Sequence, residues 1–512
     1  MPVVQTDQIT PETRQSVNET LQTYCGLDTM VTLEVWEELR RQHNQLPQIY
    51  DFERALQGPY LEIMQRGFAV DEIARRQAST ALRERLGRLE VLLNTLATAA
   101  WDKPLNPRSP AQLRDFFYST MKLPEVWLSQ KGERKLSTNR EALEKLDVYL
   151  HARPFVVCIL AIRDVAKQLE TLESAIDGDG RYRTSYNIAG TETGRPSSSS
   201  NAYGTGGNAQ NIAPALRFVF VSDPGKRLCV IDLEQVEARD VGWFCGVLFG
   251  DWSFLDSCES GDLHTNNAKL IWPELGWSAD AKANRKIADR QFYREFTYRD
   301  MAKRGSHLSN YSGTAWTMSR ALKIPLPLAV EFQARYVRGQ AANPQKGLPH
   351  IDPAYPCIPR WWQWTAQQLQ TTHQLVTPFG RRRHFFGRPE DDTTLREAIA
   401  FLPQSTTADR MNLGLWRVWR YMPEVQLLAQ TYDSITFQFD ESADTDTVVG
   451  RALELIKVEL EHQGRKYVVP GEAKLGWNWS PASEKNPLGL SKWTPGKPDQ
   501  RVRATGIKRV MM

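Results

Sequence analysis

The sequence is short of cysteine and lacks long apolar runs. Its six cysteines are scattered over 512 residues without a C-x-x-C pair, which argues against a zinc ribbon and against a disulfide framework. The N-terminal stretch MPVVQTDQITPETRQ has no apolar core, so it lacks the composition of a secretory signal. The longest uninterrupted apolar run, FVVCILAI at 155–162, is too short to span a bilayer. These absences favour a chain of the reducing cytoplasm with no membrane partner.

A strong excess of one charge is also missing. The 64 Lys and Arg residues nearly balance the 60 Asp and Glu residues, which leaves a formal net charge of +4. This balance does not identify a nucleic-acid partner, although local basic patches remain compatible with one. The segment 190–211 is rich in Gly, Ser and Asn but has no G-K-[ST] sequence. It is therefore not a P-loop, and its composition alone indicates a flexible linker.

The spacing of apolar residues divides the chain into segments of different texture. A length of 512 residues suggests about three domains or subdomains. Residues 1–46 and 48–176 show helical spacing, with a break at Pro47 and a helix start at Ser109-Pro110. Strand-like segments alternate with turns from 177, and helical spacing returns from 234 to about 370. Further strand-like patches lie at 426–440 and 466–479, before a basic tail from 491.

Two aspartates end or interrupt strand-like apolar runs. In VIDLEQVEARD, at 230–240, the apolar run stops at Asp232, and in LLAQTYDSITFQF, at 427–439, strict alternation follows Asp433. If both strands belong to one sheet, the two carboxylates would lie side by side and repel each other unless a cation lies between them. Mg²⁺ prefers a few carboxylates together with substrate phosphates. The alternative is that one is an ordinary helix start and the other an ordinary turn residue.

A row of cations and rings occupies YRDMAKRGSHLSNYSG at 298–313. Its members are spaced by four residues and would share one drifting face of a helix: Arg299, Lys303, His307 and Tyr311. Such a face is roughly 18 Å long, enough for a triphosphate, a sugar and a base. Few acids stand where they would pair with these cations, but a salt-bridged solvent face remains the alternative.

Taken together, these segments resemble family A DNA polymerases over nearly all of residues 24–480. Family motif A, D-x-S-Q-I-E-L-R, resembles residues 232–239, DLEQVEAR. Motif B, R-x3-K-x3-[F/Y]-x3-Y-G, resembles residues 299–313, and motif C, H-D-E, resembles YDS at 432–434. Four more segments resemble family segments and follow one another in the family's order: TETGRPSSSSNAYGTGGNAQNI, GDLHT, VTPFGRRRHF and PQSTTAD.

The chain departs from the family pattern at several positions. His307 stands where a Phe or Tyr is usual, and Ser312 is inserted before the glycine of motif B. In motif C, Tyr432 and Ser434 replace the family's His and Glu. The segment YCGLD at 24–28 resembles the last motif of the family's proofreading exonuclease. Because only 23 residues precede it, we expect an exonuclease-deficient enzyme in which this segment is an ordinary helix.

The resemblance implies an α+β fold of the right-hand polymerase type, with a thumb, a palm built on an antiparallel sheet and helical fingers. The expected parts are a helical N-terminal vestige of the exonuclease domain at 1–46, the thumb and connecting helices at 47–176, the palm with motif A at 177–258, the fingers with motif B at 259–400, the palm with motif C at 401–490, and a basic tail at 491–512. It would be a compact phage or plasmid type, a monomer acting in the cytoplasm, that of a bacterial host if viral.

The resemblance also implies the reaction and its site. Primer–template DNA and dNTPs would be the partners, and a dNMP would be added to the primer 3′-hydroxyl by two-metal-ion phosphoryl transfer, with release of pyrophosphate. Asp232 and Asp433 would be the catalytic ligands of two Mg²⁺ ions, with the Leu233 carbonyl as a third ligand and Mn²⁺ as a substitute. The nucleotide would be bound by Gln235, Glu237, His264, Arg299, Lys303, His307 and Tyr311. The DNA would be bound by Thr193, Arg195, Asn208, Gln210, Arg381 and Gln404.

Two other functions stay open. A single-subunit RNA polymerase shares this palm, but Glu237 matches the family's steric gate against ribose and so opposes it. A catalytically inert DNA-binding protein on the same fold would explain the altered motif C. The retained Asp232, Asp433 and motif B cations oppose that second alternative.

Overall fold

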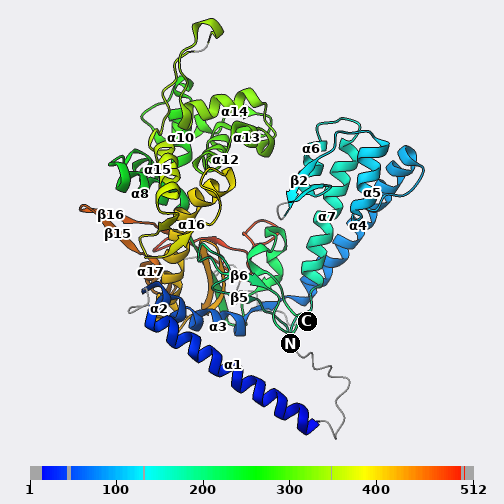
Figure 1. Cartoon of the computed structure of the whole chain (residues 1–512), viewed down its shortest axis with the longest axis vertical. Helices are drawn as coiled ribbons and strands as arrows, with labels where there is room; N and C mark the ends of the chain where they lie inside the picture. Colours follow the sequence, from blue (N-terminus) through cyan, green and yellow to red (C-terminus); the bar gives the residue numbers. More distant parts are fainter. Residues whose placement is uncertain (1–13, 43–47, 131–132, 348, 498–500, 502–512) are drawn as a thin grey trace. The chain divides into compact units, whose positions relative to one another are not determined.

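The chain divides into two compact units, Met1–Ala55 and Leu56–Met512. The structure is a computed structural model that describes residues 14–42, 48–130, 133–347, 349–497 and 501. In the first unit, α1 (Arg14–Gln42) and α2 (Gln48–Ala55) are helical (Figure 1), as the sequence predicts. The ring of Trp36 stacks on that of Tyr50 with centroids 5.7 Å apart. The break predicted at Pro47 lies outside the described residues.

The second unit begins with a mainly helical segment. Its elements are α3 (Gln57–Arg66), β1 (Phe68–Val70), α4 (Glu72–Trp101), α5 (Pro110–Arg114), the π-helical turn η2 (Asp115–Thr120), β2 (Trp127–Gln130), β3 (Glu133–Leu136), α6 (Arg140–Leu146) and α7 (Arg153–Glu173). The long helices α4 and α7 pack side by side around a core that includes Phe116 and Ile159. Ser109 caps α5 and Pro110 is in its first turn, which confirms the predicted helix start. The expectation of an almost wholly helical segment is wrong at the β2–β3 hairpin.

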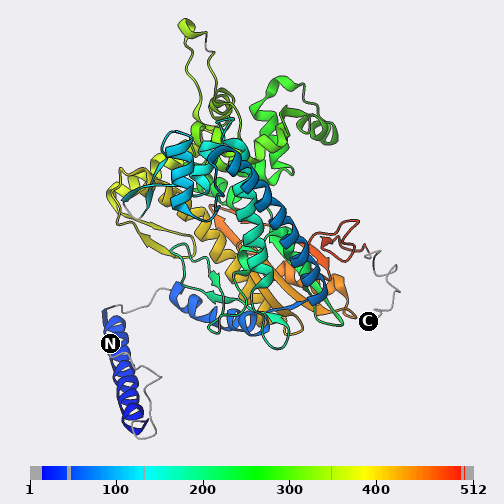
Figure 2. The same cartoon turned by 90° about the vertical axis from the view of Figure 1, so that its right-hand side faces the viewer.

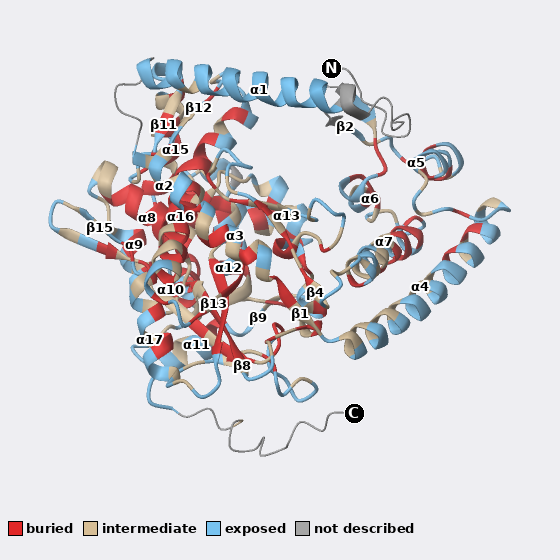
Figure 3. Cartoon of the chain, turned by 90° about the horizontal axis from the view of Figure 1, so that it is seen from below, coloured by how far each residue is buried: buried red, intermediate tan, exposed pale blue. Residues whose placement is uncertain are grey.

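A five-stranded antiparallel sheet lies at the centre of the second unit, in the order β13-β14-β8-β17-β18. Its strands are β8 (Lys226–Leu233), β13 (Gln426–Thr431), β14 (Ser434–Asp440), β17 (Gly471–Gly476) and β18 (Ser491–Lys492). Helix α16 (Asp392–Tyr421) packs on β14, and α17 (Thr445–Ile456) packs on β17. Helix α8 (Val236–Phe249), which follows β8, packs on α16. Figure 3 shows buried residues concentrated in α8, α16 and these strands, whereas much of α4 is exposed.

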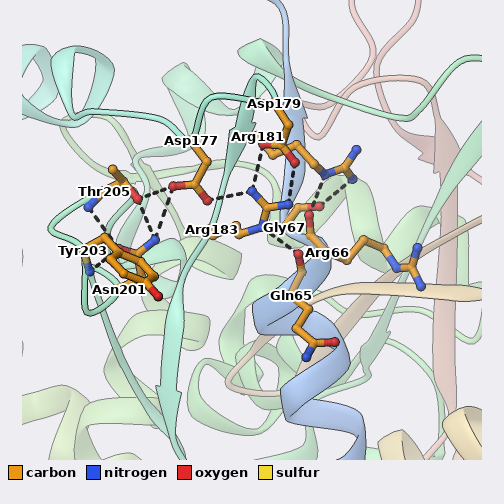
Figure 4. Close-up of polar contacts among 10 residues, drawn as sticks. All are labelled: Gln65, Arg66, Gly67, Asp177, Asp179, Arg181, Arg183, Asn201, Tyr203 and Thr205. Carbon is orange, nitrogen blue, oxygen red and sulfur yellow. Dashed lines mark hydrogen bonds and ion pairs between the residues drawn. The ribbon is translucent and has the colours of Figure 1, made fainter.

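Shorter strands and a fixed loop lead into this sheet. They are β4 (Arg181–Tyr182), β5 (Ser185–Asn187), β6 (Ser197–Ser199), η3 (Ala209–Asn211), η4 (Pro214–Val219) and β7 (Phe220–Val221). Figure 4 shows Arg183 between two carboxylates, with hydrogen bonds of 2.6 Å to Asp177 and of 2.6 and 2.8 Å to Asp179. Asp177 also accepts a hydrogen bond from the hydroxyl of Thr205. The side-chain amide of Asn201 donates a hydrogen bond of 2.6 Å to the same hydroxyl. The Gly/Ser-rich segment is therefore structured, and it is not the flexible linker that its composition alone indicates.

Helices dominate residues 253–371. They are α9 (Ser253–Glu259), α10 (Leu263–Ile271), η5 (Pro273–Leu275), α11 (Ala281–Ala288), α12 (Tyr298–Asn310), α13 (Ala315–Leu322), α14 (Leu326–Gln333), η6 (Ala334–Arg338) and α15 (Cys357–Thr371). The predicted helical run is interrupted by the hairpin of β9 (Gln291–Tyr293) and β10 (Phe296–Thr297), which turns at Arg294 with a φ of 51°. Between η6 and α15 a long loop extends outward (Figure 2) and is closed by backbone hydrogen bonds between Gln340 and Ile351.

Two further hairpins complete the described chain. They are β11 (Gln374–Val376) with β12 (Arg382–His384), and β15 (Glu459–His462) with β16 (Arg465–Val468). Most of the predicted basic tail, 498–500 and 502–512, lies outside the described residues. Among the residues that the structure describes, none of the helices combines the length and apolar composition that a membrane span requires.

A buried ion pair joins α8 to α16. Asp240 and Arg410 are both fully buried, with their oxygen and nitrogen 3.1 Å apart. Asp240 also accepts hydrogen bonds from the hydroxyls of Tyr467 at 2.8 Å and Thr407 at 3.0 Å. Burial nevertheless raises the pKa of Asp240, so its charge depends on these partners.

Arg410→Ala is therefore expected to lower the free energy of unfolding by about 3–5 kcal/mol, because it leaves a buried carboxylate without its cation. Replacing both partners, Asp240→Leu with Arg410→Met, is expected to cost much less. Denaturant unfolding of both variants measures this, with Arg417→Ala, at a partly exposed position of α16 outside the ion pair, as the control. An equal loss in the single and the double variant would contradict the explanation.

Candidate active site

The two predicted aspartates meet at one end of the central sheet. Asp232 lies near the end of β8, directly opposite Ser434 of β14. Asp433 lies in the two-residue turn between β13 and β14, where Tyr432 has a φ of 55°. The backbone N–H of Leu233 donates a hydrogen bond of 3.0 Å to the carbonyl of Asp433. Strand pairing thus brings together residues from distant parts of the chain, as the sequence predicts.

The electrostatics of this pair suit a divalent cation. Burial, followed by the charge of Asp433, raises the pKa of Asp232 to about 6. Burial also raises the pKa of Asp433, and Glu237 adds to the effect. Among the described residues, no three His, Cys, Asp or Glu side chains are grouped closely enough to cage a metal ion. Two repelling carboxylates without a full protein cage fit Mg²⁺, which completes its shell with water and substrate phosphates.

A second cluster surrounds Glu237 in the first turn of α8. The hydroxyl of Tyr311 donates a hydrogen bond of 2.5 Å to one carboxylate oxygen, and Arg195 forms an ion pair with the other. The guanidinium of Arg195 also lies 5.9 Å from the centre of the Tyr432 ring. The structure thus joins three predicted site residues from distant segments. Arg195, which we expected to contact DNA, is bound to Glu237.

The row of cations and rings is only partly helical. Arg299, Lys303 and His307 lie on α12, which begins with a capping box formed by Thr297 and Asp300. The helix ends at Asn310, so Tyr311 is its C-cap and not a helical residue, although its ring centre still lies 5.5 Å from that of His307. The inserted Ser312, with a φ of 59°, turns the chain there.

Arg299 has an acidic partner that the sequence does not reveal. Its guanidinium donates two hydrogen bonds of 3.0 Å to the carboxylate of Asp262, the N-cap of α10. Asp262 belongs to the quoted segment GDLHT, but a contact across 37 residues leaves no local signal. His264 follows on α10, and burial together with the charges of Arg299 and Lys303 lowers its pKa to about 4. His264 is therefore neutral near pH 7.

Several buried polar atoms of predicted site residues have no hydrogen-bond partner. They are Oε1 of Gln235, Nδ1 of His264 and Nε of Arg195. Gln235 precedes α8 with a φ of 55°, a left-handed conformation. Buried atoms without partners are rare and call for an explanation such as a bound ligand.

The residues predicted to contact DNA have mainly internal partners. The Gln210 amide donates hydrogen bonds of 3.1 Å to the Pro196 carbonyl and 3.3 Å to Gln430, and Arg381 pairs with the fully buried Asp409 at 2.7 Å. Asn208 caps η3. The other two are partly exposed: Thr193, which shares a hydrogen bond with Thr191, and Gln404 on α16. Contacts of all these side chains with DNA stay predictions.

Comparison with known proteins identifies relatives over most of this chain. The profile of the family described as DNA polymerase family A matches residues 74–480. The thermostable DNA polymerase I of Thermus thermophilus is 26% identical over 448 residues, which cover 83% of this chain and 47% of the relative. DNA polymerase I of Chloroflexus aurantiacus is 25% identical over 495 residues, covering 91% of this chain and 47% of the relative. The chain thus spans about half the length of these relatives.

A solved structure confirms the fold. The POL domain of Pol1 from M. smegmatis, in complex with DNA primer-template and dNTP, is similar with a TM-score of 0.62 and 20% sequence identity. The similarity covers 84% of this chain and 70% of that one. The α+β polymerase fold predicted from the sequence is therefore confirmed, whereas the exact limits of thumb, palm and fingers stay predictions.

Proposed function

The chain belongs to DNA polymerase family A, and on this premise we propose that it adds dNMP to a primer 3′-hydroxyl on a DNA template, with release of pyrophosphate. The observation that supports this most directly is the pairing of β8 with the β13–β14 turn, which brings Asp232 beside Asp433. Two adjacent, half-buried carboxylates with raised pKa values are costly unless a cation is bound.

Asp232, Asp433 and the Leu233 carbonyl would hold two Mg²⁺ ions. When bound, such ions lower the pKa of the attacking hydroxyl and neutralise charge on the triphosphate. The chain's own residues bind and orient the substrates. Lys303 and Arg299 would attract the phosphates, and Arg299 would exchange part of its contact with Asp262 for them.

Other residues would select the substrates. Glu237, fixed by Tyr311, would crowd the 2′ position of the incoming sugar and reject ribonucleotides. This supports a DNA polymerase over a single-subunit RNA polymerase. The loop with Thr193 and Arg195 would face the minor groove of primer–template DNA, where the acceptor pattern is nearly independent of sequence.

A primer-extension assay tests the proposal against both alternatives. The full chain is incubated with labelled primer–template and Mg²⁺ or Mn²⁺, and with dNTPs or NTPs in parallel. We expect extension by dNTPs that follows the template and requires the divalent ion. Extension by NTPs at equal efficiency would indicate the RNA polymerase, and binding without extension would indicate the inert DNA-binding protein.

His307 is expected to make this enzyme accept dideoxynucleotides. Its side chain is exposed on α12, with its ring centre 5.5 Å from that of Tyr311. An imidazole offers a flat face and two nitrogens for hydrogen bonds, whereas Phe offers only the face. His307→Phe should therefore discriminate more strongly against ddNTPs, by about tenfold if one hydrogen bond of about 1–1.5 kcal/mol is lost.

The measurement for His307 is the ratio of dNTP to ddNTP incorporation efficiency. His307→Tyr is the matched control, because tyrosine has the same ring as phenylalanine but keeps a polar atom, its hydroxyl. Equal ratios in the wild type and the Phe variant would show that His307 does not contact the sugar.

A further inference from the structure

Asp232 has two cross-strand neighbours, and they differ in charge. β8 lies between β14 and β17, so Asp232 is directly opposite Ser434 on one side and Glu472 on the other. Directly opposite residues of antiparallel strands have Cβ atoms about 4.5–5.5 Å apart and project from the same face. Glu472 therefore lies next to Asp232 on the same face of the sheet.

The neighbour on β14 cannot supply a charge. Ser434 stands where family motif C has a glutamate, and it is 8% exposed. Its hydroxyl shares a hydrogen bond of 2.6 Å with that of Thr431. Of the two residues opposite Asp232, only Glu472 carries a carboxylate.

Two exposed lysines hold Glu472. Lys474, on the same strand, lies 3.1 Å from one carboxylate oxygen, and Lys492, on the edge strand β18, lies 2.5 Å from the other. The lysine side chains are 39% and 63% exposed, whereas that of Glu472 is 24% exposed. Both ammonium groups can thus remain solvated if a stronger cation attracts the carboxylate.

We propose that Glu472 is a positioning residue of the metal site, whose carboxylate replaces the missing negative charge of motif C from the opposite side of Asp232. The inference rests on the proposed function. No three acids of the described chain are close enough to cage an ion, so Glu472 acts through water of the ion's hydration shell. Mg²⁺ usually keeps several waters in proteins, and a carboxylate that accepts their hydrogen bonds strengthens binding.

The test measures metal affinity without any polymerase reaction. Free Mn²⁺ is titrated by electron paramagnetic resonance against the full chain in the absence of DNA and nucleotide. Glu472→Gln is expected to raise the dissociation constant roughly tenfold or more, the usual effect of losing an outer partner of a metal site. Lys492→Gln removes one of the two ion pairs of Glu472 but keeps the carboxylate, so its dissociation constant is expected to equal or fall below that of the wild type.

The outcomes separate this inference from the proposed function. Wild-type affinity in Glu472→Gln, or an equal loss in Lys492→Gln, would overturn the inference and leave Glu472 as a support for β18. Asp232→Asn should abolish binding at this site; unchanged binding there would instead reject the metal site of the proposed function. Thermal unfolding in EDTA verifies folding, and Glu472→Asp, which keeps the charge, must bind Mn²⁺ more tightly than Glu472→Gln.

Discussion

Asp232→Asn and Asp433→Asn are each expected to reduce primer extension by roughly a thousandfold or more. Metal ions supply several kcal/mol of charge stabilisation in phosphoryl transfer, and each 1.36 kcal/mol corresponds to about a tenfold change in rate. Asparagine fills nearly the same space, so the turn that carries Asp433 and the register of β8 should persist. Primer–template binding should therefore remain close to that of the wild type.

Single-turnover extension with saturating DNA and dNTP gives the rate, and a filter-binding titration gives the DNA affinity. Asp440→Asn is a matched control, because this exposed residue ends β14, the strand that follows Asp433, and its ion pair is with Lys226, at the opposite end of β8 from Asp232. Extension at near wild-type rate by either active-site variant would show that the two-metal assignment is wrong.

Asp232→Asn is also expected to raise the free energy of unfolding when no metal is present. Burial and Asp433 raise the pKa of Asp232 to about 6 from an ordinary value of 3.8. Folding therefore favours the protonated carboxyl, and this contribution is fully present below about pH 3.8 and is lost as the pH rises through 6. In EDTA at pH 7.5, Asp232→Asn should raise the free energy of unfolding by at most about 2–3 kcal/mol. Mg²⁺ should stabilise the wild type and not the variant.

The sequence predicts those parts of the site that follow from local periodicity. Alternation after Asp433 predicts β14, because a period of two is visible within a few residues, and the apolar run that stops at Asp232 predicts the buried strand β8. The four-residue spacing from Arg299 likewise predicts α12, although it cannot indicate that the helix ends at Asn310. The insertion of Ser312 is visible in the sequence, but its effect on the helix end depends on the backbone.

The sequence does not reveal those site residues that are defined by contacts between distant segments. Glu472 faces Asp232 only through the register of β17 against β8, and Asp262 meets Arg299 only when α10 packs on α12. The motif around Arg381 assigns this residue to DNA, yet it is bound to Asp409 of α16. No local pattern distinguishes a cation that binds phosphate from one that neutralises a buried carboxylate.

Glu237→Ala is expected to lower the preference for dNTPs over rNTPs by roughly a hundredfold, the scale on which a pocket discriminates by size. In the structure the Glu237 side chain cannot move aside easily, because Tyr311 donates to one carboxylate oxygen and Arg195 pairs with the other. A fixed carboxylate is a better steric barrier than a mobile one, since it does not turn away from an extra hydroxyl.

A second variant separates the effect of holding the Glu237 carboxylate in place from the effect of its size. Tyr311→Phe removes one hydrogen bond worth about 0.5–1.5 kcal/mol but leaves the carboxylate in place, so it should lower the preference by only a few fold. Burial raises the pKa of Tyr311 well above its ordinary value, so the hydroxyl remains a donor throughout the working pH range. Glu234→Ala, three residues earlier, is the control and should keep the wild-type ratio. If Glu237→Ala also keeps the wild-type ratio, another residue excludes the ribose. If Tyr311→Phe accepts rNTPs as readily as Glu237→Ala, the barrier is the orientation of the carboxylate and not its presence.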